Sequence, residues 1–403
     1  MKSFSRGACV LFALGLVTVL AGTAVAEDGK IFSYEQAFSG PAATRTGADR
    51  GIDGVLGGIP EIEGWLDDET YLELRVDGDE KNKQLFAVNA ADGSATLYRD
   101  YPALAADLPE GFDLQEPADA NQDLTRLVVE HEGDLYFVRL PEVKVHRLTA
   151  NEAEEKNATL SPDGLWVAYT RNNDLFAYDL ENSLEHQLTS DGTDEIMNGY
   201  ASWVYYEEIL GRRGEYRAFW WSPDSSRLVF LRFDDSKVPE FPIYHADGQH
   251  GELEIQRYPK AGDPNPKVRS AVVSVTDGKT TWLDFDPDAD HYLAFPYWAP
   301  DSSRVLMQWM NRGQDTLRLF WCDLETGEKT LIHEERQQAW VQFYKDIEML
   351  SDGGGFLFTS DVDGWNHIYL HDMDGKLKSR LTSGSWRVRS IETVDEDGGW
   401  VYF

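Results

Sequence analysis

The chain has 403 residues, and its 71 acidic side chains outnumber its 37 lysines and arginines, which gives a formal net charge of −34. A field of this sign repels nucleic acid and anionic lipid, so neither is an expected partner. Hydrophobic residues make up 42% of the chain. Because no proline-, serine- or glutamine-rich tract divides it, we expect a folded protein without a linker.

The N-terminus has the pattern of an export signal. Lys2 and Arg6 precede an apolar run over residues 8–21, and Ala24-Val25-Ala26 supplies an A-x-A cleavage site. This predicts a signal peptide over residues 1–26 and a protein exported to the periplasm or the outside. An uncleaved N-terminal anchor is the alternative, although the run is short for a membrane span.

Cysteine use agrees with a chain that folds without disulfides. Cys9 lies in the predicted signal, which leaves Cys322 alone in the mature chain, so no intramolecular disulfide can form. Cys322 stands between Trp321 and Asp323 in a strand-like run. We therefore interpret it as a small buried residue rather than as a nucleophile.

The rest of the chain repeats a pattern of alternating apolar residues that opens at a turn and closes at Leu-Thr. The openings are Ser161-Pro162-Asp163-Gly164, Ser222-Pro223-Asp224, Ala299-Pro300-Asp301 and Ser351-Asp352-Gly353, and the closings are Arg147-Leu148-Thr149, His186-Gln187-Leu188-Thr189 and Arg380-Leu381-Thr382. Residues 72–97 and 272–283 alternate in the same way around Asp-Gly turns. Period-two alternation between such turns indicates β-hairpins.

Units of this kind, repeated every 40 to 60 residues or so, are typical of a β-propeller. We therefore predict an all-β fold, with a lead-in segment over residues 27–59 and a propeller domain over residues 60–403. Uneven spacing of the units indicates insertions on particular blades. Residues 198–217 are one such insertion, and their composition favours a short helix.

Within this insertion, two adjacent carboxylates, Glu207 and Glu208, follow Trp203, Tyr205 and Tyr206. A carboxylate pair beside aromatic walls is suited to holding a positively charged group. The alternative is a solvated helix face, because neighbours on an α-helix point about 100° apart. The pair converges on one ligand only if it lies at a helix end or in an irregular turn.

Motifs of competing chemistries are missing from the sequence. It contains no G-x-S-x-G, no phosphate-binding G-x-x-x-x-G-K-[ST], no H-E-x-x-H and no C-x-x-C. His333 begins H-E-E-R-Q, which lacks the second histidine of a zinc site. The acidic alternation from Asp284 lacks the glycine of a calcium loop and has Phe295 at its twelfth position, so we interpret it as a turn. We predict no cofactor and no metal.

Two signatures together resemble the dipeptidyl peptidase IV family, serine exopeptidases of the prolyl oligopeptidase clan. The first is W-V-Y-x-E-E from Trp203, followed by W-W-S-P-D from Trp220. The second is Val238-Pro239 followed by the YPKAG segment over residues 258–262. Weaker matches are DHYL over residues 290–293, Trp340-Val341 and DGWNHIYL over residues 363–370.

The resemblance implies an eight-bladed propeller followed in the chain by an α/β-hydrolase domain with a Ser-Asp-His triad. This sequence ends at Phe403 in a strand-like stretch with no triad, so we expect a fragment that lacks the last blade and the catalytic domain. No catalytic residue is therefore predicted in it. In the family the hydrolase domain follows the propeller in the chain, so the resemblance implies that domain as a partner of the propeller in the intact protein. The resemblance also allows a homodimer of the intact protein.

The resemblance also implies a function for the glutamate pair. Glu207 and Glu208, beside the three aromatic residues, would hold the free α-ammonium of a peptide, and the intact enzyme would release Xaa-Pro or Xaa-Ala dipeptides. In the family an arginine from an earlier blade assists; no secure match is found here, and Arg212 and Arg213 are the open alternatives. A second function class is a non-catalytic exported propeller that binds protein or carbohydrate.

Overall fold

The computed structural model describes residues 24–25, 31–32, 61–76, 83–106 and 108–403. The predicted signal and lead-in segments therefore lie largely outside the described residues. By its contacts the chain divides into two compact units, Met1–Leu108 and Pro109–Phe403. None of the helices in the described ranges has the length and apolar character needed to cross a membrane.

Within its described residues, the first unit contains an antiparallel sheet of four strands in the order β3-β4-β5-β6 and a short strand pair, β1-β2. The strands are β1 (Ala24–Val25), β2 (Ile31–Phe32), β3 (Glu61–Trp65), β4 (Thr70–Val76), β5 (Lys83–Asn89) and β6 (Ala95–Asp100). The short helix α3 (Tyr101–Leu104) follows, and the Asp100 carboxylate caps it by accepting the N–H of Ala103. The hairpin predicted over residues 72–97 is confirmed.

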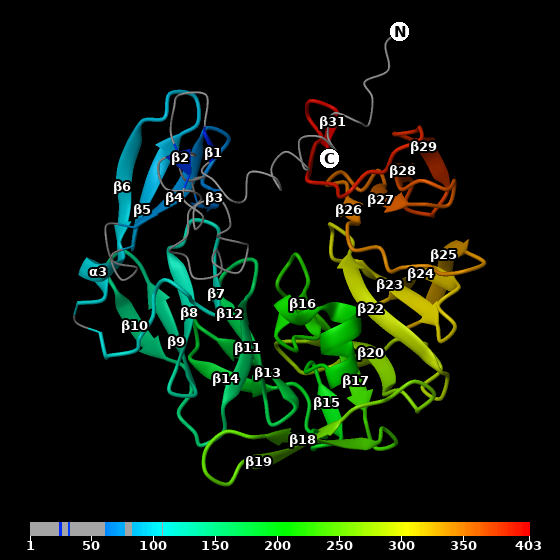
Figure 1. Cartoon of the computed structure of the whole chain (residues 1–403), viewed down its shortest axis with the longest axis horizontal. Coiled ribbons are helices and arrows are strands. Elements are labelled where there is room, and N and C mark those ends of the chain that lie inside the picture. The colour runs from blue at the N-terminus through cyan, green and yellow to red at the C-terminus, as the bar shows by residue number, and fades with distance from the viewer. Residues whose placement is uncertain (1–23, 26–30, 33–60, 77–82, 107) are drawn as a thin grey trace. The chain divides into compact units, whose positions relative to one another are not determined.

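The second unit is a series of antiparallel sheets (Figure 1). Its first two sheets are β7 (Asp119–Ala120), β8 (Arg126–His131), β9 (Asp134–Arg139) and β10 (Lys144–Arg147), then β11 (Glu155–Leu160), β12 (Trp166–Arg171), β13 (Asp174–Asp179) and β14 (Leu184–Gln187). The third has five strands, β15 (Ile196–Asn198), β16 (Phe219–Trp221), β17 (Arg227–Asp234), β20 (Lys267–Ser274) and β21 (Thr280–Trp282).

Two more four-stranded sheets complete the series, together with a terminal strand pair. They are β22 (His291–Trp298), β23 (Arg304–Asn311), β24 (Thr316–Asp323) and β25 (Lys329–Arg336), then β26 (Glu348–Met349), β27 (Phe356–Ser360), β28 (His367–His371) and β29 (Leu377–Arg380), and the pair β30 (Thr393–Asp395) and β31 (Trp400–Tyr402). In the four-stranded sheets consecutive strands pair as neighbours. Sequential four-stranded antiparallel sheets are the blades of a β-propeller, so the predicted all-β propeller class is confirmed.

The Leu-Thr closings have a common structural purpose. In three sheets the threonine hydroxyl accepts a backbone N–H from the third strand, and the preceding leucine N–H donates to the carbonyl of that same residue. The pairs are Leu135 with Thr149 at 2.8 Å, Leu175 with Thr189 at 2.9 Å, and Ile368 with Thr382 at 3.0 Å. Each closing therefore satisfies the backbone where the outer strand ends.

The Pro-Asp openings join neighbouring sheets. The backbone N–H of Asp163 donates to the hydroxyl of Ser225 in the next opening, at 3.0 Å. The N–H of Asp224 donates in the same way to Ser302, also at 3.0 Å. These turns occur at equivalent positions of successive blades, so the repeat in the sequence carries contacts between blades as well as within them.

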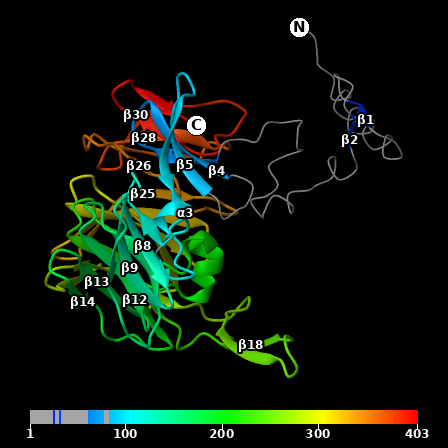
Figure 2. The same cartoon turned by 90° about the vertical axis from the view of Figure 1, so that its left-hand side faces the viewer.

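One apolar cluster extends from the insertion through the sheets β15–β21 and β22–β25 to β27. Cys322 lies in it without solvent exposure, which confirms that it is a buried side chain, and burial raises the pKa of its thiol to about 12. The strands β18 (Glu240–His245) and β19 (Glu252–Arg257) form a separate two-stranded arm that projects beyond the sheets (Figure 2).

Candidate functional site

The predicted insertion interrupts an edge strand. β15 and β16 both pair with β17, at residues 232–234 and 228–230 respectively. The chain leaves this edge after Asn198 and returns at Phe219, and a bridge between Tyr200 and Arg217 closes the base of the loop. The Ala218 N–H donates to the Gly199 carbonyl at 2.8 Å. The loop is thus held rigidly where it joins the blade, as expected for residues 198–217.

The helix in this loop is η2 (Tyr205–Leu210), a π-helix and not an α-helix. Helices of this kind are rare, and they occur often at functional sites because the wider turn displaces side chains from their α-helical positions. Gly211, with φ +86°, ends η2 in a conformation that glycine adopts without cost, and a 3-10 turn, η3 (Arg212–Gly214), follows. Two adjacent carboxylates converge on one ligand only at a helix end or in an irregular turn, and η2 is such an irregular segment.

Tyr205 contacts two blades and holds η2 against them, through β22 and β17. Its side chain is fully buried, and its hydroxyl accepts the backbone N–H of Leu293 in β22 at 3.2 Å. Its ring packs edge-on against Phe233 of β17, with 4.6 Å between centroids. Burial raises the pKa of Tyr205, so the phenol remains neutral. The structure therefore places Tyr205 beneath the helix, in the core.

The two carboxylates differ in their surroundings. Glu207 keeps 18% of its side chain exposed and accepts a hydrogen bond from Arg212, whose own side chain is 70% exposed. Glu208 is exposed, and no hydrogen bond or ion pair to another described residue accounts for its carboxylate. Of the two arginine alternatives, Arg212 contacts Glu207; the side chain of Arg213 lies outside what the structure describes.

Aromatic rings support the residue that precedes the pair. Tyr206 stacks on Tyr216, with centroids 3.9 Å apart and planes 10° apart, and Tyr216 stacks on Tyr200 at 4.9 Å. Tyr216 reaches this position from a left-handed backbone, φ +71°, which follows Glu215 at φ +46°. Both are unusual conformations for residues with a side chain, so the loop accepts local strain to close the stack.

Trp203 connects the two sequence signatures. Its ring lies 4.6 Å from that of Tyr258, the first residue of the YPKAG segment. The neighbouring Ser202 donates its hydroxyl proton to the Asp235 carboxylate at 2.9 Å, three residues before Val238. Asp235, Ser202 and Tyr216 were not predicted as site residues. Their only signal in the sequence was proximity to the two signatures.

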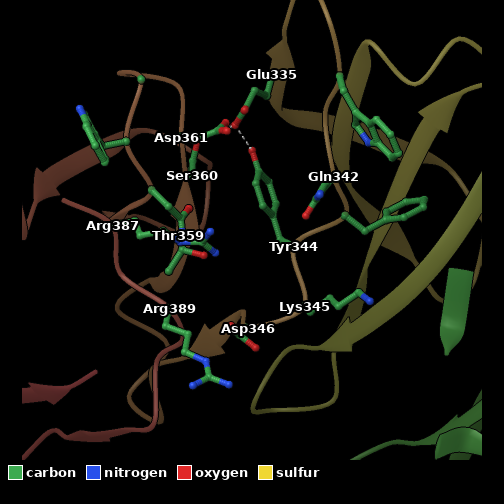
Figure 3. A pocket seen from close by; sticks show the side chains of 15 residues that line it. Glu335, Gln342, Tyr344, Lys345, Asp346, Thr359, Ser360, Asp361, Arg387 and Arg389 are labelled. Atoms are coloured by element: carbon green, nitrogen blue, oxygen red, sulfur yellow. Dashed lines mark hydrogen bonds between the residues drawn. The ribbon is translucent and has the colours of Figure 1, made fainter. Parts of the chain in front are cut away.

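A separate cavity of about 640 Å³ lies between β25, the loop after it and β27 (Figure 3). One buried polar group in its wall is Glu335, which is 6% exposed and accepts hydrogen bonds from Tyr344 and Ser360, both at 2.5 Å, and from Gln337 at 3.1 Å. Figure 3 shows the Tyr344 hydroxyl directed at Glu335. This carboxylate already has three donors, so we interpret the network as a link between two blades.

Comparison with known proteins agrees with the residues that carry the resemblance. A model of the dipeptidyl peptidase IV (DPP IV) N-terminal region matches residues 122–403. Dipeptidyl peptidase 4 of Trichophyton rubrum is 32% identical over 260 residues, which are 61% of this chain and 33% of that protein. A protein of Aspergillus clavatus named "Probable dipeptidyl peptidase 4" is 30% identical over 285 residues, 66% of this chain and 36% of its own length.

The crystal structure of Porphyromonas gingivalis dipeptidyl peptidase 4 superposes with a TM-score of 0.72 at 26% sequence identity, over 85% of this chain and 49% of that one. The chain thus spans about a third of the length of these curated relatives and about half of the solved one. The family model alone covers well over half of the chain, including the insertion and both signatures. The chain therefore belongs to the dipeptidyl peptidase IV family, of which residues 122–403 represent the N-terminal region.

Proposed function

We propose that this chain is the substrate-binding propeller of an exported serine dipeptidyl peptidase, and that Glu207 and Glu208 hold the free N-terminus of a peptide. The observation that carries the proposal is the π-helix, which presents two adjacent carboxylates from a rigid, buried base. Within the described part of the chain Glu208 forms no ion pair, and the arginine paired with Glu207 is largely exposed. A peptide α-ammonium has the charge and the donors to bind both carboxylates at once.

Fixing the N-terminus determines where a peptide is cut. An extended chain advances about 3.3 Å per residue, so a nucleophile held two residues from the glutamate pair cuts after the second residue. The product is a dipeptide, with proline or alanine second. In this proposal the serine, its base and the oxyanion donors belong to a hydrolase domain of the intact enzyme.

The side chains around the pair have supporting roles in the proposal. Trp203 and Tyr206 flank the bound N-terminus, and Tyr205 supports the helix from within the core. Export follows from the predicted signal peptide over residues 1–26. Peptides with a free N-terminus are the proposed ligands, and nucleic acid is disfavoured by the net charge of −34.

The test is a binding measurement on the purified chain. A short peptide with proline second and a free N-terminus is titrated by calorimetry beside its N-acetylated form. Acetylation removes the ammonium, so we expect the acetylated peptide to bind at least about tenfold more weakly, the cost of one charge-assisted hydrogen bond or more. Glu207→Gln and Glu208→Gln should each weaken the binding of the peptide with a free N-terminus by a similar factor.

Glu215→Gln is the matched control. Glu215 is an exposed carboxylate on the same loop, and its known contact uses its backbone carbonyl, which accepts from Asn157. This variant removes the same charge from the loop and should leave peptide binding unchanged within about twofold. Equal binding of the free and acetylated peptides to the unmodified chain would refute the proposed function.

A further inference from the structure

A second cavity, of about 570 Å³, is lined in part by residues at the base of the insertion over residues 198–217. We refer to it as the Asp235 cavity. It is lined by Asp194, Glu195, Met197, Tyr200, Ala201, Trp203, Tyr216, Asp235, Glu240, Ile255, Gln256 and Arg257. Neither Glu207 nor Glu208 lines it, so its carboxylates are not those of the proposed function, although Trp203 is shared with that site.

Asp235 is the unusual group in this cavity. The residue is 3% exposed, and its Oδ2 accepts from the Ser202 hydroxyl at 2.9 Å. Its Oδ1 is buried and has no hydrogen-bond partner among the described residues. A buried carboxylate oxygen without a donor is costly, and native structures rarely leave one unmatched. The orphan oxygen points to a donor that the chain itself does not supply.

Arg257 is the cation in the cavity wall, and it already has other partners. Arg257 donates to the carbonyl of Val238 at 2.8 Å, forms an ion pair with Glu195, and has Glu240 at 3.5 Å. The cavity wall therefore carries four carboxylates against this one guanidinium. Burial raises the pKa of Asp235 to about 7, and Arg257 offsets this only in part. The cavity is short of positive charge.

Both the donor set and the walls favour an organic cation over a metal ion. Within the described ranges, no three acidic, histidine or cysteine side chains are placed to hold a metal. Aromatic side chains of Tyr200, Tyr216 and Trp203 line the cavity instead. Tyr216 is stacked between Tyr200 and Tyr206, so the attraction of an aromatic face for an alkylammonium group rests on Trp203. Met197 and Ile255 add apolar surface suited to an alkyl chain.

We propose that the Asp235 cavity binds an aliphatic primary amine, whose ammonium group donates to the free Oδ1 of Asp235 while its alkyl chain packs against the aromatic wall. Ser202, whose hydroxyl donates to Asp235, lies three residues before the start of η2. The Ser202 side chain therefore connects an amine bound at Asp235 to the helix that carries Glu207 and Glu208. The ligand class is a small aliphatic monoamine or diamine.

The test is calorimetric titration of the purified 403-residue chain with pentylamine, slightly below neutral pH, in two buffers of different ionisation enthalpy. An ammonium that pairs with Asp235 displaces the proton held there, so we expect net proton release on binding. The alcohol of the same length should not bind. Absence of amine binding, or binding without proton release, would mean that the cavity holds only water beside a neutral Asp235, and would overturn the proposal.

Variants locate the binding. Asp235→Asn should weaken pentylamine at least about tenfold and abolish the proton release. The double variant Glu207→Gln/Glu208→Gln should keep both, because these residues do not line the cavity; the opposite pattern would assign the amine to the glutamate pair and refute the second site. Ser202→Ala retains the carboxylate and should still bind the amine, which keeps the test decisive if Asp235→Asn does not fold.

Discussion

The rings of Tyr206 and Tyr216 stack with 3.9 Å between their centroids, and this contact fixes the residue that immediately precedes Glu207. Tyr216 comes from the returning side of the loop, where a left-handed backbone places its ring under η2. The position of the glutamate pair therefore depends on a partner that follows it by nine residues or so, and not on the helix alone.

The first prediction tests this support. Tyr216→Ala removes the stack, and because the carboxylates then sample more positions, we expect the free-N-terminus peptide to bind roughly three- to tenfold more weakly, in line with an aromatic pair worth about 0.5–1.5 kcal/mol. Tyr216→Phe keeps the ring and should bind normally. Calorimetry on both variants checks it, and a loss in Tyr216→Phe would assign the effect to the hydroxyl instead.

The second prediction concerns Arg212. Its ion pair with Glu207 is exposed on the arginine side, and exposed pairs contribute only about 0.2–1 kcal/mol. Arg212→Gln should therefore leave stability nearly unchanged. Because it frees Glu207, it should strengthen binding of the free-N-terminus peptide up to about fivefold, more at low salt than at high salt. Weaker binding in Arg212→Gln would instead show that this arginine helps to hold the peptide.

The third prediction is a pH dependence of stability from Asp235. Desolvation raises its folded pKa to about 7; the hydrogen bond from Ser202 and the charge of Arg257 oppose the rise, and the charges of Asp234 and Glu195 add to it. The folded state thus binds a proton that the unfolded state has lost above pH ~4. Because the folded state binds more protons than the unfolded state in this range, the free energy of unfolding falls as pH rises from about 4 to about 7. The fall is at most about 4 kcal/mol.

The comparison with Asp235→Asn isolates this contribution from those of other carboxyl groups. We expect the difference in unfolding free energy between the two proteins to change with pH over this window and to become constant above it. Urea unfolding at several pH values measures it. Parallel stability profiles would show that Asp235 titrates normally, and pentylamine at saturating concentration should reduce the slope in the unmodified chain only.

The fourth prediction addresses the Leu-Thr closings. The Thr189 hydroxyl accepts the N–H of Leu175 and donates to Asp174 at 2.7 Å. Thr189→Val keeps the shape and removes both bonds, so it should lower the free energy of unfolding by about 1–3 kcal/mol. Thr330→Val is the control, since Thr330 is an exposed strand residue, and it should change stability by less than about 0.5 kcal/mol. Equal effects of the two variants would contradict the role assigned to the closing.

Much of the fold followed from local sequence. Alternating apolar residues specify which strand face is buried, and Asp-Gly, Pro-Asp and Leu-Thr segments specify where strands turn, because these effects act over a few residues. The insertion over residues 198–217, which contains both carboxylates, was predictable for the same reason. The family signatures then associated Glu207 and Glu208 with a peptide N-terminus.

The tertiary structure decided the individual roles of similar residues. Tyr205 and Tyr206 are adjacent and chemically identical, yet one is buried against β17 and β22 and the other stacks on Tyr216 beside the carboxylates. Both tyrosines belong to the π-helix η2, which directs their side chains differently. Contacts from other blades hold this helix in place, and no local sequence pattern encodes those contacts. Asp235 likewise acquires its raised pKa only because folding buries it with a single donor, since desolvation depends on neighbours that the strands bring together from distant parts of the chain.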